Sequence, residues 1–114
     1  MPYLKIQTNA ELADSERTAL IKQLSSHVAE MLGKSERYVM VVYEFKPHMV
    51  FAGSEETTAF IELKSIGLDS TKTQEYSASL CERLNQTLGV AQERIFIEFS
   101  DAPRPLWGWN GRTF

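Results

Sequence analysis

The chain repeats itself once, at an offset of half its own length. The segment GKSERYVMV, which begins at Gly33, returns as GVAQERIFI from Gly89, and its Glu-Arg pair recurs 57 residues later in a chain of 114. At the same offset, the opening YLKI at Tyr3 lies over FIEL at Phe60. These segments alternate apolar and polar residues, as half-buried strands do. The repeat predicts two copies of one supersecondary unit.

Two helical patterns lie between the predicted strands. Apolar residues recur every fourth position in each pattern, which is helical spacing: Leu20, Leu24, Val28 and Leu32 in the first, and Tyr76, Leu80, Leu84 and Leu88 in the second. Each series ends at a glycine, Gly33 or Gly89, as helices commonly do. Asp14–Ser15 precede the first predicted helix, and Thr71 with Gln74 has the spacing of a capping box before the second.

Each unit therefore reads β-α-β, with a helix long enough to connect two parallel strands. Right-handed connections place both helices on the same face of the sheet. We expect a single α+β domain over residues 1–114, a two-layer sandwich of a four-stranded sheet with two helices on one face. A sheet rich in Val, Ile and Phe should not leave its other face bare in water, so we also expect self-association.

Composition excludes several classes of protein. Fifteen acidic and twelve basic residues give a formal charge of −3, which argues against a nucleic-acid binder. The single cysteine, Cys81, excludes an internal disulfide and a cysteine-built metal site. No apolar run approaches the roughly 20 residues of a membrane span. Without a secretory signal pattern, the predicted location is cytoplasmic, with leaderless secretion as the alternative.

The residue types alone give Pro2 an ordinary role. Leu4 and Ile6 alternate with polar residues, and a proline is well placed as the first residue of such a strand, because its missing N–H costs no ladder hydrogen bond.

Several short segments together carry a more specific signal. They are Met1-Pro2 opening a strand that ends Thr8-Asn9, Gly33-Lys34, Ser65-Ile66-Gly67, Tyr76-Ser77, Leu80-Cys81, Arg94-Ile95-Phe96-Ile97, Gly108-Trp109-Asn110 and Thr113-Phe114. In this order and spacing, the chain resembles the macrophage migration inhibitory factor family of the tautomerase superfamily over essentially its whole length.

The resemblance implies a cofactor-free enzyme that assembles as a homotrimer, with active sites between neighbouring subunits. The implied reaction is keto–enol tautomerisation of phenylpyruvate-type substrates, small aromatic 2-oxo acids. The implied base is Pro2, exposed by removal of Met1. A free α-amine has a pKa of about 7.7–8.0, and burial or a nearby cation lowers it. Such an amine suits proton transfer at carbon near neutral pH.

The resemblance also implies the substrate-binding residues. Lys34 matches the family's substrate-binding lysine, and Ile66 matches a position whose backbone contacts ligands. Lys64, close to Ile66 in the sequence, is a second candidate cation. Aromatic candidates for the substrate ring are Tyr3, Tyr38, Phe96, Trp107, Trp109 and Phe114. Ordinary explanations stay open: Lys34 as a lysine complementing a helix dipole, Ile66 as an apolar strand end, and half of the aromatics as packing.

The sequence departs from vertebrate members of that family at several positions. Phe96 replaces a pocket tyrosine, and Glu98 replaces an asparagine, which brings a negative charge toward an anionic substrate. We therefore expect weaker activity or a different preferred substrate. Thr58 and Ile61 occupy the two cysteine positions of the vertebrate thiol-oxidoreductase motif, and Cys81 is expected to be a small core residue.

Two other functions remain as alternatives. One is a leaderless, cytokine-like signalling protein that binds a receptor and has weak or vestigial tautomerase activity. Family members bind a chemokine receptor through an arginine in the first loop and an aspartate in the second, but Glu11–Ala13 and Phe45–Pro47 lack both. Receptor binding is therefore doubtful. The other is a trimeric domain with a vestigial pocket.

Overall fold

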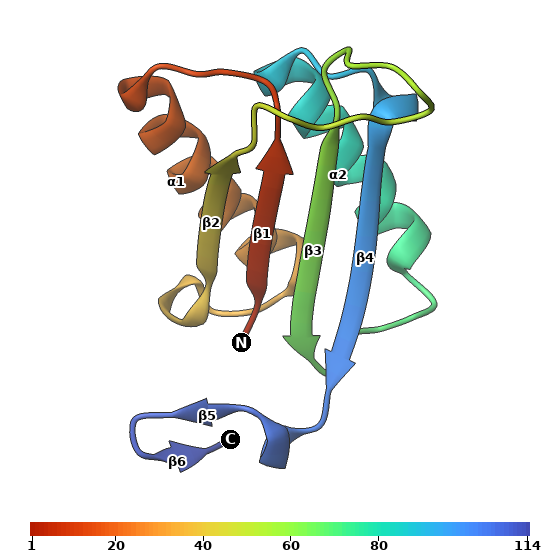
Figure 1. Ribbon diagram of the computed structural model, residues 1–114. Helices are drawn as coiled ribbons and strands as arrows, with labels where there is room; N and C mark the ends of the chain where they lie inside the picture. The colour runs from red at the N-terminus through yellow and green to blue at the C-terminus, as the bar shows by residue number, and fades with distance from the viewer.

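The computed structural model describes the whole chain, residues 1–114, and confirms the predicted α+β fold. The elements of the two units are β1 (Tyr3–Thr8), α1 (Asp14–Leu32) and β2 (Met40–Phe45), then β3 (Ala59–Ile66), α2 (Thr73–Leu88) and β4 (Ile95–Ala102). The sheet order is β2-β1-β3-β4. Strands within a unit are parallel, whereas β1 and β3 are antiparallel at the centre. Both helices lie against one face of the sheet (Figure 1).

The core lies between the sheet and the helices. Alternate strand residues meet the predicted apolar stripes of the helices, and the most deeply buried of these are Leu4, Ile6, Leu24, Val28, Ile61, Leu63, Leu80 and Leu84. Cys81 is partly buried and packs against this cluster, as predicted. Gly33 and Gly89 end the helices in the left-handed conformation, with φ of 63° and 70°. Neither helix is long and apolar enough to cross a membrane.

The first helix begins two residues earlier than predicted, and the second begins after Asp69–Thr71 as predicted but without the predicted cap. Asp14–Ser15 lie inside α1, and Glu16 accepts a hydrogen bond from the backbone N–H of the residue before the helix (3.1 Å). The capping box of Thr71 and Gln74 does not form. Instead, the Asp69 carboxylate accepts from the N–H (2.9 Å) and hydroxyl (2.6 Å) of Thr71. A short acidic side chain that bonds two residues ahead makes a turn rather than a cap.

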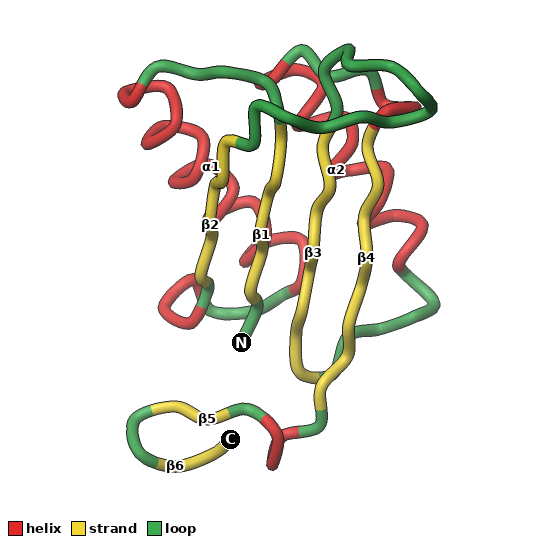
Figure 2. The backbone as a smooth tube through the Cα atoms, viewed as in Figure 1, coloured by secondary structure: helices red, strands yellow, loops and turns green.

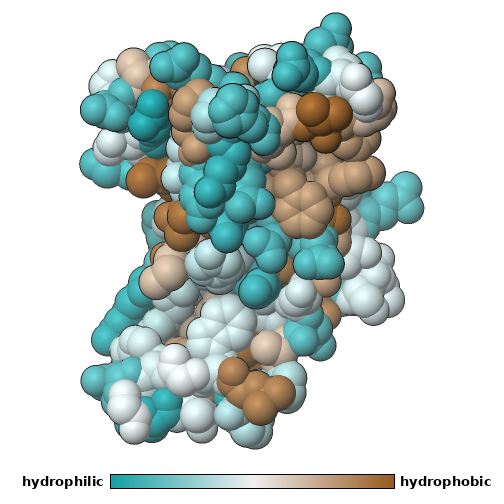
Figure 3. All heavy atoms as spheres, in the orientation of Figure 1, coloured by the Kyte–Doolittle hydropathy of each residue, from teal (hydrophilic) through white to brown (hydrophobic).

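The open face of the sheet, which no helix covers (Figure 1), carries charged and apolar residues side by side. Because side chains alternate along a strand, most Val, Ile and Leu residues point toward the helices, and the open face carries Lys5, Glu44, Glu62, Lys64 and Glu98 beside Tyr3, Phe60 and Phe96. Lys5 pairs with Glu44 at 3.3 Å. Figure 3 shows hydrophilic and hydrophobic residues mixed over this side. The same face also exposes Met40 (62%) and Phe96 (55%), so the expectation that an assembly covers it stays a prediction.

The chain ends in a small hairpin that was not predicted. After the short helical turn η3 (Arg104–Leu106), β5 (Gly108–Trp109) pairs with β6 (Arg112–Thr113). Asn110 and Gly111 join them with φ of 52° and 74°. Two positive φ values are what a tight type I′ turn requires, and Asn-Gly is its usual sequence. The hairpin stands apart from the sheet, close to the start of β1 (Figures 1 and 2).

Candidate active site

A pocket of about 520 Å³ lies at the N-terminus of the chain. The start of β1, the short helical turn η1 (Glu36–Tyr38) and the C-terminal hairpin form its walls. Its lining residues are Met1, Pro2, Tyr3, Arg37, Tyr38, Val39, Met40, Lys64, Trp107, Gly108, Trp109 and Phe114. The volume is in the range of small-molecule sites, and most of the lining is apolar, as in such sites.

Pro2 lies at the base of this pocket, fully buried where β1 begins. Its carbonyl accepts a hydrogen bond from the N–H of Met40 (3.0 Å), which ties the N-terminus to β2. The free amine belongs to Met1, and burial lowers its pKa, with a further lowering from the charge of Lys34. In a chain that keeps Met1, the nitrogen of Pro2 is an amide and cannot act as a base.

Lys34 and Ile66 meet although 32 residues separate them in the chain. The Lys34 ammonium donates to the carbonyl of Ile66 at 3.1 Å. Gly33 ends α1 and directs the chain so that Lys34 reaches the end of β3. Lys34 is half-buried, and its charge is close enough to affect the N-terminal amine. The structure thus brings the lysine and the isoleucine carbonyl together near the N-terminus, although neither residue lines the pocket itself.

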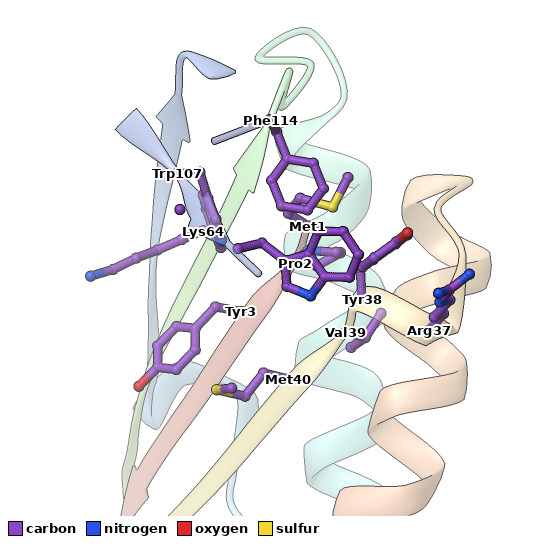
Figure 4. A pocket seen from close by; sticks show the side chains of 12 residues that line it. Met1, Pro2, Tyr3, Arg37, Tyr38, Val39, Met40, Lys64, Trp107 and Phe114 are labelled. Carbon is purple, nitrogen blue, oxygen red and sulfur yellow. The ribbon is translucent and has the colours of Figure 1, made fainter. Parts of the chain in front are cut away.

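Three aromatic rings form one wall of the pocket. The ring of Tyr38 meets those of Trp109 and Phe114 edge-on, with centroids 5.2 and 5.6 Å apart. Trp109 and Phe114 are stacked 5.6 Å apart. Tyr3 lies on another side, where the Lys64 ammonium is 5.8 Å from its ring centroid (Figure 4). Apart from Phe96, the predicted aromatics all line this pocket.

Phe96 and Glu98 do not reach this pocket. Both lie on the open face of β4, and the register places Phe96 beside Phe60 and Gln7, at the opposite end of the sheet from Tyr3. Phe96 is 55% exposed and packs on Phe51, with ring centroids 4.8 Å apart. Within one chain, therefore, neither residue contacts the region of Pro2.

The pocket also contains residues that sequence reasoning missed. Arg37, Val39, Met40 and Gly108 were not predicted. Arg37 directly precedes Tyr38, a predicted pocket residue, and this position in the sequence was the available sign that Arg37 also lies at the pocket. The lining includes two basic side chains and no acidic side chain. No group of three or more His, Cys, Asp or Glu side chains in the chain is arranged to hold a metal ion.

Two β-α-β units on one sheet, with a pocket around the N-terminus, define a tautomerase-superfamily fold. The family model for macrophage migration inhibitory factor (MIF) matches residues 1–114. The chain is 37% identical to a MIF homolog of Brugia malayi, over 100% of this chain and 99% of that protein. It is 30% identical to the MIF of Rattus norvegicus with the same coverage. The chain belongs to the MIF family.

Solved structures agree with this assignment. A MIF homologue from Prochlorococcus marinus shares 43% identity, with a TM-score of 0.91 over 98% of each chain. The MIF of Toxoplasma gondii shares 33% identity, with a TM-score of 0.90 over 98% of this chain and 99% of that one. The predicted family and fold are therefore confirmed.

Proposed function

We propose that this protein is a keto–enol tautomerase of the phenylpyruvate type, with Pro2 as its base after Met1 is removed. The observation that carries the proposal is the N-terminus itself. It lies in a largely apolar pocket beside Lys34, and both burial and that cation lower the pKa of the terminal amine. After removal of Met1, the secondary amine of Pro2 would experience the same two influences from a more buried position.

The proposed reaction moves one proton from carbon and one to oxygen. The neutral amine of Pro2 accepts a proton from the carbon next to the ketone. The C–H electron pair then forms the new C=C bond, and the carbonyl electrons move to oxygen, which takes the proton back from the protonated Pro2 amine, directly or through solvent, to give the enol and the neutral amine. A base whose pKa lies near the working pH is the most effective for such a step. The reverse sequence returns the proton to carbon.

Residues in and beside the pocket would position the substrate. Lys34 would bind the substrate carboxylate, because its hydrogen bond to the Ile66 carbonyl holds the ammonium where its charge acts on the N-terminal amine. The wall of Tyr38, Trp109 and Phe114 is suited to an aromatic ring, since ring pairs stabilise one another in stacked and edge-on geometries. Tyr3 and Lys64 are proposed contacts on another side of the site.

Family membership also supports a homotrimer. The family resemblance places Phe96 and Glu98 at the pocket of a neighbouring subunit in that assembly, and neither reaches the pocket of its own chain. Phe96 would offer a ring without a hydroxyl. Glu98 would add a negative charge near an anionic substrate, which should weaken its binding.

The test is a tautomerase assay on protein whose N-terminus has been sequenced. Met1-cleaved protein should convert phenylpyruvate between its keto and enol forms well above the buffer rate, and Pro2→Gly should lose most of that activity. A chain that retains Met1 should be inactive, because its Pro2 nitrogen is an amide. Equal rates for the wild-type protein and Pro2→Gly would contradict the proposal.

A further inference from the structure

The basic side chains around the pocket have no acidic partners. The chain has a net charge of −3, yet its three ion pairs involve Lys5, Arg17 and Lys46, all outside the pocket. Arg37 and Lys64 line the pocket, and no carboxylate lies within ion-pair distance of either. Within one chain, an acidic protein that lines one cavity with two basic side chains and no acidic side chain has a site suited to anions.

Arg37 is held at the rim of this cavity. Its guanidinium lies 5.5 Å from the centroid of the Tyr38 ring, and that ring is itself wedged edge-on against Trp109 and Phe114. The N–H of Arg37 donates to the Ser35 hydroxyl (3.3 Å), which stabilises the start of η1. A guanidinium stacked on an aromatic ring keeps its planar set of N–H donors free for a bidentate contact with a carboxylate or phosphate.

Arg37 and Lys64 occupy different sides of the site. Figure 4 shows them on opposite sides of the group formed by Pro2, Tyr38 and Phe114. Lys64 lies against Tyr3, whereas Arg37 continues the aromatic wall outward. A substrate ring placed against that wall would therefore point its far end toward Arg37.

We propose that Arg37 binds a second anionic group of the substrate, so that the preferred substrate is a dianionic 2-oxo acid, with an acidic group at the far end of an aromatic or unsaturated body. This inference rests on the proposed function for the orientation of the 2-oxo acid end toward Lys34. It goes further by naming Arg37 as the residue that selects the substrate class.

The experiment compares unreactive ligands, so that binding is measured without turnover. Cinnamate carries one carboxylate, 4-carboxycinnamate carries two, and 4-carbamoylcinnamate matches the second in size without its charge. Binding to Met1-cleaved protein is measured by titration calorimetry. We expect 4-carboxycinnamate to bind about 10-fold more tightly than either of the other two, the gain typical of one charge-assisted contact.

Variants identify the residue responsible. Arg37→Gln should remove the preference for the dianion, and Arg37→Lys should retain part of it, because charge remains while the bidentate geometry is lost. Lys22→Gln, which removes an exposed cation from α1, should keep the full preference. Equal binding of the three ligands by the wild-type protein would overturn the proposal. So would a preference that survives Arg37→Gln, or one that only Lys64→Gln removes.

The two proposals can fail separately. If Pro2→Gly tautomerises phenylpyruvate as fast as the wild-type protein, the proposed function is wrong, but the cinnamate titrations still decide whether Arg37 selects dianions. If Pro2→Gly is inactive and the three cinnamates bind alike, the enzyme stands and the substrate class proposed for it is wrong.

Discussion

The Phe114 ring joins the C-terminal hairpin to the wall of the pocket. It meets Tyr38 edge-on and stacks on Trp109, in both cases with centroids 5.6 Å apart. Its backbone N–H also donates to the carbonyl of Trp107 (3.1 Å). Phe114→Ala keeps that backbone bond and the contact between Tyr38 and Trp109, but removes both ring pairs made by the last residue.

The size of the effect follows from these two contacts. An aromatic pair is worth about 0.5–1.5 kcal/mol beyond its buried area, so the loss is about 1–3 kcal/mol. Opening that both undocks the hairpin from Tyr38 and separates its own Trp109–Phe114 stack loses both contacts, so the ratio of closed to opened hairpin should fall about 5- to 150-fold. Because Trp107 and Trp109 line the pocket from this hairpin, the KM for an aromatic substrate should rise as well.

Hydrogen exchange measures the change directly. Amides in residues 107–114 should exchange about 5- to 150-fold faster in Phe114→Ala, whereas those of β1 and β3 should keep their rates, since local opening of the hairpin leaves the core intact. Phe114→Tyr retains the ring and should exchange like the wild-type protein. A double-mutant cycle with Tyr38→Ala should give a coupling energy of about 0.5–1.5 kcal/mol between the two rings.

Two results would refute this reasoning. If residues 107–114 exchange at the same rate in Phe114→Ala and the wild-type protein, the rings do not hold the hairpin. If Phe114→Tyr opens the hairpin as much as Phe114→Ala does, the ring contacts are not the cause.

Three other substitutions test separate parts of the structure. Lys34→Met should raise the pKa of the N-terminal amine. Because only the neutral amine accepts a proton, the rising limb of kcat/KM against pH should then move to higher pH. A limb that does not move would exclude this role of Lys34. Thr8→Val should lower the urea midpoint far more than Thr8→Ser, because the fully buried hydroxyl bonds one backbone carbonyl (2.7 Å) and one backbone N–H (3.0 Å), and each unpaired group costs about 1–3 kcal/mol. Arg94→Lys should speed proteolytic cleavage within 47–57, since the guanidinium donates to four carbonyls there; unchanged cleavage would contradict that anchoring.

Sequence reasoning located much of the site, but it did so through the family resemblance. Residue types alone favoured an ordinary strand start for Pro2 and an ordinary helix end for Lys34. Neither periodicity nor composition could show that the Lys34 ammonium contacts the Ile66 carbonyl, because that distance depends on how α1 packs across the sheet. Arg37 was missed because an exposed arginine beside a tyrosine has no distinctive pattern in a sequence.

The sequence by itself determined the architecture. The repeat and the two apolar stripes specify strand, helix, strand, twice over, since burial on one face must match the period of each element. Gly33 and Gly89 mark the helix ends because the residue that follows a helix often takes the left-handed conformation, which glycine adopts without steric cost. Only the tertiary structure decided what the open face of the sheet carries and which residues surround the N-terminus. Those outcomes depend on strand register and on contacts between distant segments, such as Phe114 against Tyr38, and local sequence does not contain them.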